Sequence, residues 1–408
     1  MNKLIEGYDI GPKRARYMAD IALMKFSEED VKRILSQLES LPKIPGSNNP
    51  CGPVFNRYSP FPIWVHVFLW SLRSIGIVLL LPGQVGATAV LLTRGRFAPI
   101  WKEIPRPSIE LISWASEFYE FIKAPLELVE KSIEREAALC INRNGKFGIK
   151  SEGYTVMSHV WGETMGWQTP DEWGPVDLQL RKKGIPMAHF MRFFNRCETE
   201  WLWVDVIAMP EVLEDMDAVE KEKIERLRIG VINCLRSIYT KSDKLVVLDT
   251  LLLRLNTRSP IDVAVTLCLS FWITCLWTWI EARLAPKVII KTANWSIDLD
   301  SILELLGKTF LNEEHRYYGV LAHLWTLREE TINLLNPVSI MESACIGCGG
   351  RYTAIKIDIA RALYPLLGLN WEYGWDLDQG FEKIVNTYPG EEEWVTKFRQ
   401  MKFGLHDM

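Results

Sequence analysis

Four residues suited to a small-molecule site follow the first strand-like run in the middle of the chain. The run covers residues 154–157, and Ser158, His159, Trp161 and Gly162 come after it. A histidine titrates near neutral pH, and an indole ring can stack on a planar ligand. These residue types indicate a binding or catalytic site at the end of this strand, with His159 as a hydrogen-bonding or acid–base group.

Three more residues complete the candidate set. Asp205 lies near the end of the next strand-like run, residues 201–208. Trp277 and Glu281 stand four positions apart in a helical pattern, so they share one helix face. We expect Glu281 to be partly exposed in a cleft, close to the loop that follows the first strand.

Structural roles are the alternatives for these residues. Glu281 could form an ion pair with Arg283, and Asp205 could cap the segment that follows it. His159 could be a structural hydrogen-bonding group, and the tryptophans could belong to the core. No GxGxxG, Walker A or GxSxG motif occurs in the sequence, which disfavours Rossmann-type binding, P-loop chemistry and a hydrolase triad.

Short apolar runs alternate with helical patterns between residues 154 and 291. Strands are predicted near 154–158, 201–207, 244–249 and 287–291, and helices over 187–197, 220–240 and 260–285. This alternation predicts an α/β fold with a parallel sheet that helices cover on both faces. Ligands of such sheets bind at the carboxyl ends of the strands, so the strand-end residues are expected to line one crevice.

The patterns divide the chain into three regions. A helical N-terminal region is expected at 1–150, the α/β unit at 151–300 and a helical C-terminal region at 301–408. A second helical stretch over 108–140, followed by a turn signal at 142–145, sets the first boundary.

Composition predicts a cytoplasmic protein without metal, nucleic acid or membrane partners. The 47 basic and 51 acidic side chains leave a net charge of −4, which gives no basis for non-specific nucleic-acid binding. The N-terminus lacks a secretory pattern, so the eight cysteines are expected as thiols, and Cys345 and Cys348 lack further zinc ligands. Residues 61–81 are long enough to cross a bilayer, but Arg73 near their middle favours burial inside the protein.

Four stretches, in order, resemble the motifs of fungal heterokaryon-incompatibility (HET) domains. Residues 154–162 (YTVMSHVWG) are similar to the opening motif, and residues 201–205 (WLWVD) to the second. The helix ending at 236–239, before a Val-Val-Leu-Asp strand, is similar to a third. Residues 277–281 (WTWIE) resemble the fourth, and residues 351–368 resemble the region that often trails these domains.

The sequence departs from the family pattern at several points. Ala208-Met-Pro-Glu211 stands where the family continues with Cys-Ile and then Pro or Asn. Cys275 and Ile280 replace the Arg and Gln of the fourth motif. Residues 1–150 have no counterpart in the resemblance.

HET domains are similar to Toll/interleukin-1-receptor (TIR) domains, which are flavodoxin-like α/β units. Several TIR domains cleave NAD between nicotinamide and ribose with a single glutamate that follows a tryptophan on a helix. The resemblance therefore implies that Glu281 and His159 are catalytic and that NAD is a substrate, with no cofactor. It implies these substrate contacts: Ser158, Trp161, Gly162, Asp205 and Trp277.

The function implied by the resemblance is an effector of self/non-self recognition or cell death that acts by hydrolysing NAD. Two alternatives belong to other classes. One is a small-molecule biosynthetic enzyme that reuses the fold, with the tryptophan-rich interior lining an apolar pocket. The other is a non-catalytic module that signals by homotypic assembly into a homo-oligomer.

Overall fold

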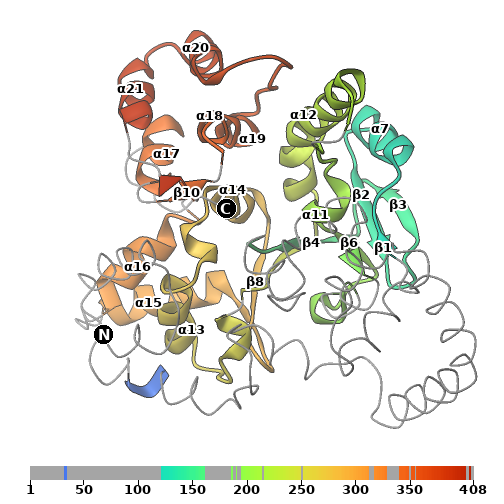
Figure 1. Cartoon of the computed structure of the whole chain (residues 1–408). Coiled ribbons are helices and arrows are strands. Elements are labelled where there is room, and N and C mark those ends of the chain that lie inside the picture. Colours follow the sequence, from blue (N-terminus) through green and yellow to red (C-terminus); the bar gives the residue numbers. More distant parts are fainter. Residues whose placement is uncertain are drawn as a thin grey trace, which may run out of the picture.

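The computed structural model describes residues 32–34, 121–160, 185–186, 190, 194–213, 216–249, 251–311, 317–328, 340–348, 351–353, 355–400 and 404–405. Within these ranges a seven-stranded mixed sheet has the order β3-β2-β6-β4-β7-β8-β9. Helices pack around it (Figure 1). The α/β fold predicted from the alternating patterns is confirmed at this level.

Four parallel strands form the centre of the sheet. They are β6 (Trp201–Trp203), β4 (Thr155–Ser158), β7 (Lys244–Val247) and β8 (Val288–Lys291). Strand β4 pairs in parallel with β6 and with β7, and β7 pairs in parallel with β8. Residues 245–247 of β7 are fully buried, as expected for a strand covered on both faces. The apolar runs thus predicted the sheet centre correctly.

The sheet extends beyond the expected α/β unit. Strands β2 (Ala138–Asn142) and β3 (Phe147–Lys150) form an antiparallel hairpin that joins the sheet next to β6. The expected helical stretch over 108–140 is therefore wrong for its last residues, although α7 (Leu126–Glu134) lies within it. A short apolar run does not distinguish a buried strand from a buried helix.

The turn signal at 142–145 is confirmed as a turn, and it connects the two strands of this hairpin. The side-chain oxygen of Asn142 accepts from the backbone N–H groups of Asn144 and Lys146, both at 3.0 Å. Asparagine favours turns through such local bonds. At the opposite edge of the sheet, β9 (Ser296–Asp298) pairs antiparallel with β8.

Two helices of the central region contact one another. Helix α12 (Ala218–Thr240) begins where the side chain of Asp217 accepts from Glu220 N at 2.8 Å. Helix α14 (Leu276–Leu284) contacts α12.

The single helix expected over 260–285 is divided in two. Helix α13 spans Pro260–Cys268, and a 3-10 turn, η3 (Leu252–Arg254), precedes it. A second 3-10 turn, η4 (Trp272–Thr274), separates α13 from α14. The Thr278 hydroxyl donates to the Trp272 carbonyl, and the Ser270 hydroxyl donates to the Leu267 carbonyl at 2.8 Å. Hydroxyl side chains that bond to the backbone in this way compete with helix continuation.

The strand predicted over 201–207 is also shorter than expected. Strand β6 stops at Trp203, and a helix, α11 (Asp205–Ala208), follows after one residue. The Asp205 side chain accepts from Val206 N at 2.7 Å. A carboxylate in the first turn of a helix is favoured by the exposed N–H groups there.

The described C-terminal part is mostly helical, as expected. It contains α15 (Leu299–Leu311), α16 (Tyr318–Trp325), α17 (Ile340–Cys348), α18 (Asp358–Arg361), α19 (Leu363–Leu367), α20 (Leu377–Thr387) and α21 (Glu392–Gln400). Two short strand pairs lie outside the main sheet. They are β1 (Phe121–Ile122) with β5 (Ile185–Pro186), and β10 (Tyr352–Thr353) with β11 (Gly404–Leu405).

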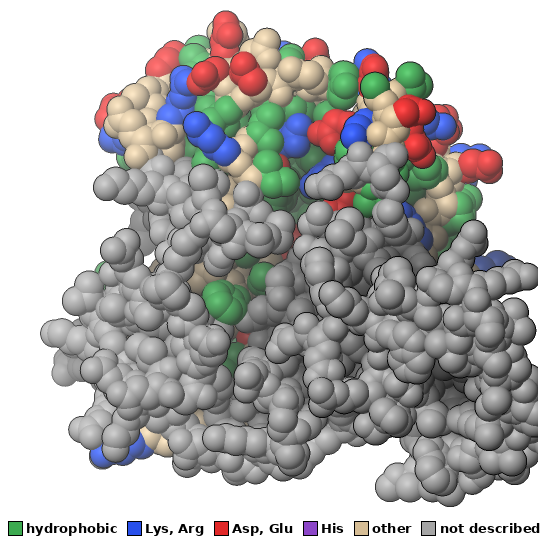
Figure 2. Space-filling model, viewed as in Figure 1, with side chains coloured by type: hydrophobic (Ala, Val, Ile, Leu, Met, Phe, Trp, Pro, Cys, Tyr) green, Lys and Arg blue, Asp and Glu red, His purple; other side chains and the backbone are tan. Residues whose placement is uncertain are grey.

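The C-terminal helices dock on α12 and α14. Asn233 of α12 donates to the Trp371 carbonyl at 3.0 Å and accepts from Trp371 N at 2.8 Å. Arg236, one turn later, donates to the carbonyls of Pro365 and Leu366. Figure 2 shows basic and acidic side chains interspersed over the described surface at the top of the view, where α12, α20 and α21 lie in Figure 1.

Residues 61–81, with Arg73, lie outside the described residues, so their burial stays a prediction. None of the helices within the described ranges combines the length and the apolar character that a membrane crossing requires. The division of the chain into three regions also stays a prediction.

Two helical glycines test how tightly α17 packs on α14. A methyl group at Gly347 would overlap the indole of Trp279, a fully buried side chain, whereas a methyl group at Gly307 of α15 meets nothing within 4 Å. We expect Gly347→Ala to lower the free energy of unfolding by about 1–3 kcal/mol. The control Gly307→Ala should raise it by about 0.5–1 kcal/mol, because alanine favours helix. Urea unfolding measures both, and equal effects would contradict this packing.

Candidate functional site

A carboxyl group lies buried where β4 meets α14. The Ser158 hydroxyl, at the end of β4, donates a hydrogen bond to the Glu281 carboxylate. The Trp272 indole N–H donates to the Ser158 oxygen at 2.7 Å. Ser158 and Trp272 are fully buried, and Glu281 exposes 6% of its surface. The three side chains thus form a continuous chain of hydrogen bonds from η4 through β4 to α14.

Tyr239 of α12 lies near the same carboxyl, close enough for each group to shift the pKa of the other. Its ring packs edge-on against Trp203 of β6, with centroids 5.7 Å apart and planes at 76°. Glu281 therefore receives a hydrogen bond from Ser158 on the strand and lies near Tyr239 on the helix.

The pKa of Glu281 is raised from 4.5 to about 8. Burial is the main cause, because it disfavours the charged form, and the nearby Asp205 carboxylate adds repulsion. The hydrogen bond from Ser158 and the nearby Tyr239 hydroxyl act in the opposite direction. At neutral pH Glu281 is therefore mostly protonated. The expectation of a partly exposed carboxylate is wrong, because α12 and β4 cover Glu281 on two sides.

His159 and Asp205 form a pair beside this carboxyl. His159 Nε2 lies 2.8 Å from Asp205 Oδ1. A carboxylate oxygen can only accept, so the imidazole donates from Nε2. The imidazole exposes 2% of its side chain and the carboxylate 15%. His159 therefore orients Asp205, and Asp205 is the more accessible of the two.

Trp277 turns away from the carboxyl that it was expected to accompany. Its indole N–H donates to Asp358 Oδ2 of α18 at 3.1 Å. Trp277 thus ties α14 to the C-terminal helices, while Glu281 on the same helix contacts β4. Trp161 and Gly162 lie outside the described residues, so their predicted roles as substrate contacts stay predictions.

Three residues of this arrangement were not among the sequence-based candidates. They are Tyr239, Trp272 and Asp249. Asp249 follows β7 and accepts from Leu251 N at 2.9 Å, Leu252 N at 3.1 Å and Trp272 N at 3.4 Å. Asp249 could have been found by the strand-end rule that selected Ser158 and Asp205. Tyr239 and Trp272 lie in apolar patterns that give no such signal.

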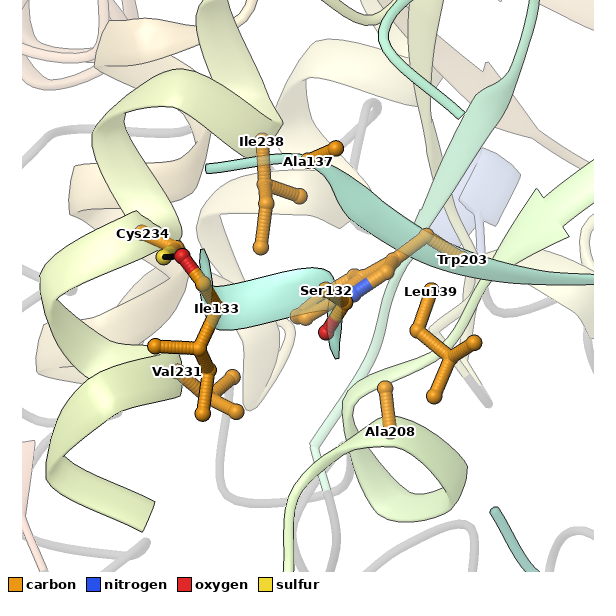
Figure 3. Close-up of a pocket in the computed structure, with 9 residues that line it drawn as sticks. All are labelled: Ser132, Ile133, Ala137, Leu139, Trp203, Ala208, Val231, Cys234 and Ile238. Atoms are coloured by element: carbon orange, nitrogen blue, oxygen red, sulfur yellow. Dashed lines mark hydrogen bonds between the residues drawn. The ribbon is translucent and has the colours of Figure 1, made fainter. Parts of the chain in front are cut away.

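Apart from this site, a small cavity between α7, β2 and α12 has room for about one water molecule (Figure 3). It is lined by Ser132, Ile133, Ala137, Leu139, Trp203, Ala208, Val231, Cys234 and Ile238. In the part of the chain that the structure describes, no group of three His, Cys, Asp or Glu side chains is placed to hold a metal ion, and the cysteines there are free thiols.

Comparisons with family models, curated proteins and solved structures give no match to this chain. The resemblance to HET and TIR domains therefore stays a prediction. What the structure adds is geometric. It brings Ser158, Asp205 and Glu281 together with His159, and it places Trp277 against Asp358 instead.

The raised pKa of Glu281 predicts how stability depends on pH. The folded chain binds the Glu281 proton up to about pH 8, whereas the unfolded chain releases it near 4.5. The folded state thus holds more protons between these values, so the free energy of unfolding falls as pH rises through this window. The slope approaches about 1.4 kcal/mol per pH unit at most.

Glu281→Gln removes this proton exchange and should flatten the decline, which urea unfolding at pH 5, 6, 7 and 8 measures. Glu304→Gln is the matched control. Glu304 is exposed, and its hydrogen bond from Lys308 lowers its pKa, so it is ionised in both states across the window. Equal slopes in the wild type and in Glu281→Gln would show that Glu281 ionises normally.

Proposed function

We propose that this chain is a TIR-like enzyme of the HET type that hydrolyses the bond between nicotinamide and ribose in NAD. Consumption of cytoplasmic NAD would make it an effector of cell death in self/non-self recognition. The observation that carries the proposal is the Glu281 carboxyl, buried at the end of the central strand β4 and held there by Ser158.

The strand order supports the site and the finer fold class. In chain order the parallel strands are β4, β6, β7 and β8, and in the sheet they lie as β6-β4-β7-β8. This is the 2-1-3-4 order of flavodoxin-like sheets, in which ligands bind where the first and third strands diverge. Ser158 stands at that point, because it ends β4 in register with Val247 of β7.

The charges around Glu281 suit a cationic substrate. Asp205 is the charged group that most affects the Glu281 carboxyl. In a poorly solvated site the charge of one carboxylate attracts a positive charge strongly, and it does so more when a second carboxyl ionises. The nicotinamide ring of NAD is a pyridinium cation. When it binds beside Glu281, it should favour the ionised carboxylate and so prepare the site for the reaction.

The proposed reaction needs few groups. The carbon–nitrogen bond breaks with both electrons moving to the pyridinium nitrogen, so nicotinamide leaves as a neutral molecule. The ionised Glu281 stabilises the positive charge that develops on the ribose. A water oxygen then bonds to the ribose carbon, and the proton that it loses passes to Glu281. His159 keeps Asp205 oriented toward the same charge.

The proposal predicts that the purified protein converts NAD to nicotinamide and ADP-ribose, which chromatography separates. Glu281→Gln keeps the shape of the side chain and an acceptor for Ser158, but it cannot carry a charge. We expect it to lower the rate at least about 100-fold. Glu304→Gln, on the exposed face of α15, should retain the wild-type rate.

A folded wild-type protein that leaves NAD intact would contradict the proposal, as would an active Glu281→Gln variant. If the protein forms concentration-dependent oligomers without NAD turnover, homotypic signalling replaces hydrolysis as the better account. If it converts another small molecule instead, a biosynthetic role does.

The pH dependence gives a separate prediction. Because the free protein carries Glu281 with a pKa of about 8, and the ionised form reacts, kcat/KM for NAD should rise with pH and level off above about 8. Initial rates at low NAD concentration from about two units below that pKa to about one and a half units above it measure the profile. A flat profile, or one that falls over this range, would mean that the protonated carboxyl is the active form.

A further inference from the structure

The hydroxyl of Ser158 lies between an indole and a carboxyl group. The Trp272 indole N–H donates to the Ser158 oxygen at 2.7 Å, and the Ser158 hydroxyl donates to Glu281. An indole nitrogen can only donate, so the serine oxygen must be the acceptor in the first of these bonds. The single hydroxyl proton of Ser158 is thereby left for Glu281. The first bond thus fixes the direction of the second.

The indole of Trp272 has a different partner from that of Trp279, another fully buried tryptophan. The Trp279 indole donates to the Thr326 carbonyl at 2.9 Å and so satisfies the backbone. The Trp272 indole instead donates to a hydroxyl that bonds to the Glu281 carboxyl. A hydroxyl that accepts a hydrogen bond becomes a stronger donor, so the indole strengthens the bond that reaches Glu281.

Contacts that do not involve Ser158 hold Trp272 in place. Its backbone N–H lies 3.4 Å from Asp249 Oδ2, and its carbonyl accepts from the Thr278 hydroxyl. The Asp249 carboxylate also accepts from Leu251 N at 2.9 Å, which fixes it at the end of β7. The 3-10 turn η4 therefore sets the position from which the indole meets Ser158.

Several titratable or charged groups surround the Glu281 carboxyl, directly or through one neighbour. They are Asp205 of α11, Tyr239 of α12, Cys275 before α14, His159 against Asp205, and Arg351 near Cys275. Asp205 disfavours the ionised carboxyl, and Tyr239 favours it. None of these groups contacts Glu281 by way of Trp272, so a change in the Trp272 indole N–H can reach the carboxyl through Ser158.

We propose that Trp272 is a positioning residue that fixes the Ser158 hydroxyl as a donor toward Glu281 and thereby stabilises the ionised carboxylate. As a role in catalysis this rests on the proposed function, whereas the effect on Glu281 itself does not. Trp272 need not touch the substrate, because it acts through Ser158. Hydrogen bonds that end on a carboxylate are stronger than those between neutral groups, so the effect is large enough to measure.

Trp272→Phe removes the N–H donor and keeps an aromatic ring. The Ser158 hydroxyl then becomes a weaker donor that can turn away, so the pKa of Glu281 should rise by about half a unit to one unit. As a result, kcat/KM for NAD at pH 7 should fall roughly three- to tenfold and recover as pH rises, because the carboxyl still ionises. The control Trp279→Phe removes the same donor from another fully buried position and should leave the midpoint of the pH profile in place.

A Ser158→Ala background tests whether Trp272 acts through Ser158. Ser158→Ala alone should raise the midpoint at least as much as Trp272→Phe does, since it removes the donor to Glu281. Adding Trp272→Phe to Ser158→Ala should then give no further shift of the midpoint, although it lowers stability in both backgrounds. An equal shift in both backgrounds, or the same shift in Trp279→Phe, would mean that packing alone links Trp272 to Glu281 and would overturn the inference.

A titration without turnover separates this inference from the proposed function, and it leaves Trp272 unchanged. The NMR signal of the Trp272 indole N–H, assigned through its own backbone amide, is followed from about two pH units below the Glu281 pKa to about two above it. We expect the signal to shift as Glu281 ionises. The shift should be lost in Glu281→Gln and in Ser158→Ala, and the Trp279 indole signal should not follow Glu281.

Each outcome of this titration decides between the two proposals. A Trp272 signal that stays constant in the wild type, or that shifts equally in Ser158→Ala, would refute the role of Trp272 even in an active enzyme. A signal that follows Glu281 through Ser158 in a protein that leaves NAD intact would support the role of Trp272 and refute the hydrolase.

Discussion

A carboxyl group buried in the interior of a protein requires a hydrogen-bond donor, and around Glu281 that requirement joins α14 to the central strand β4. The hydroxyl of Ser158 comes from the central strand, and Tyr239 of α12 lies near the same carboxyl. Burial of an ionisable group without such a partner is costly. The approach of α14 to β4 is therefore part of the same constraint that keeps Glu281 inside, and displacement of either element would leave polar groups unpaired.

The hydrogen bonds continue beyond Glu281 and bring the strand ends into one network. Asp249 after β7 accepts from the backbone N–H of Trp272, whose indole donates to Ser158. This arrangement explains why the chain forms a 3-10 turn between α13 and α14 where the pattern predicted continuous helix. The turn brings the Trp272 indole to Ser158, which bonds in turn to Glu281 of α14. The break in the helix is thus linked to the geometry of the site.

The C-terminal helices contribute to the site although they supply none of its described groups. Trp277 bonds to Asp358, the indole of Trp279 donates to the Thr326 carbonyl at 2.9 Å, and Asn233 and Arg236 of α12 bond to the segment around Trp371. Helix α14, which carries Glu281, and helix α12 beside it are therefore both held by contacts outside the sheet.

The sequence by itself determined the sheet centre, because runs such as residues 245–247 are apolar throughout, as expected for a strand covered on both faces. It also selected Ser158 and Asp205, since polar residues after buried strands are conspicuous, and Glu281, through its helical spacing from Trp277. Only the tertiary structure decided that residues 138–150 join the sheet, because short apolar runs fit strand and helix equally. The partners of each side chain were likewise decided in three dimensions. Trp277 and Glu281 stand four positions apart on one helix but contact different elements. Tyr239 lies in an apolar pattern typical of a core residue, and only the packing of α14 brings Glu281 near it. Local sequence patterns indicate which residues are buried, whereas hydrogen bonds between residues far apart in the chain depend on how the elements pack.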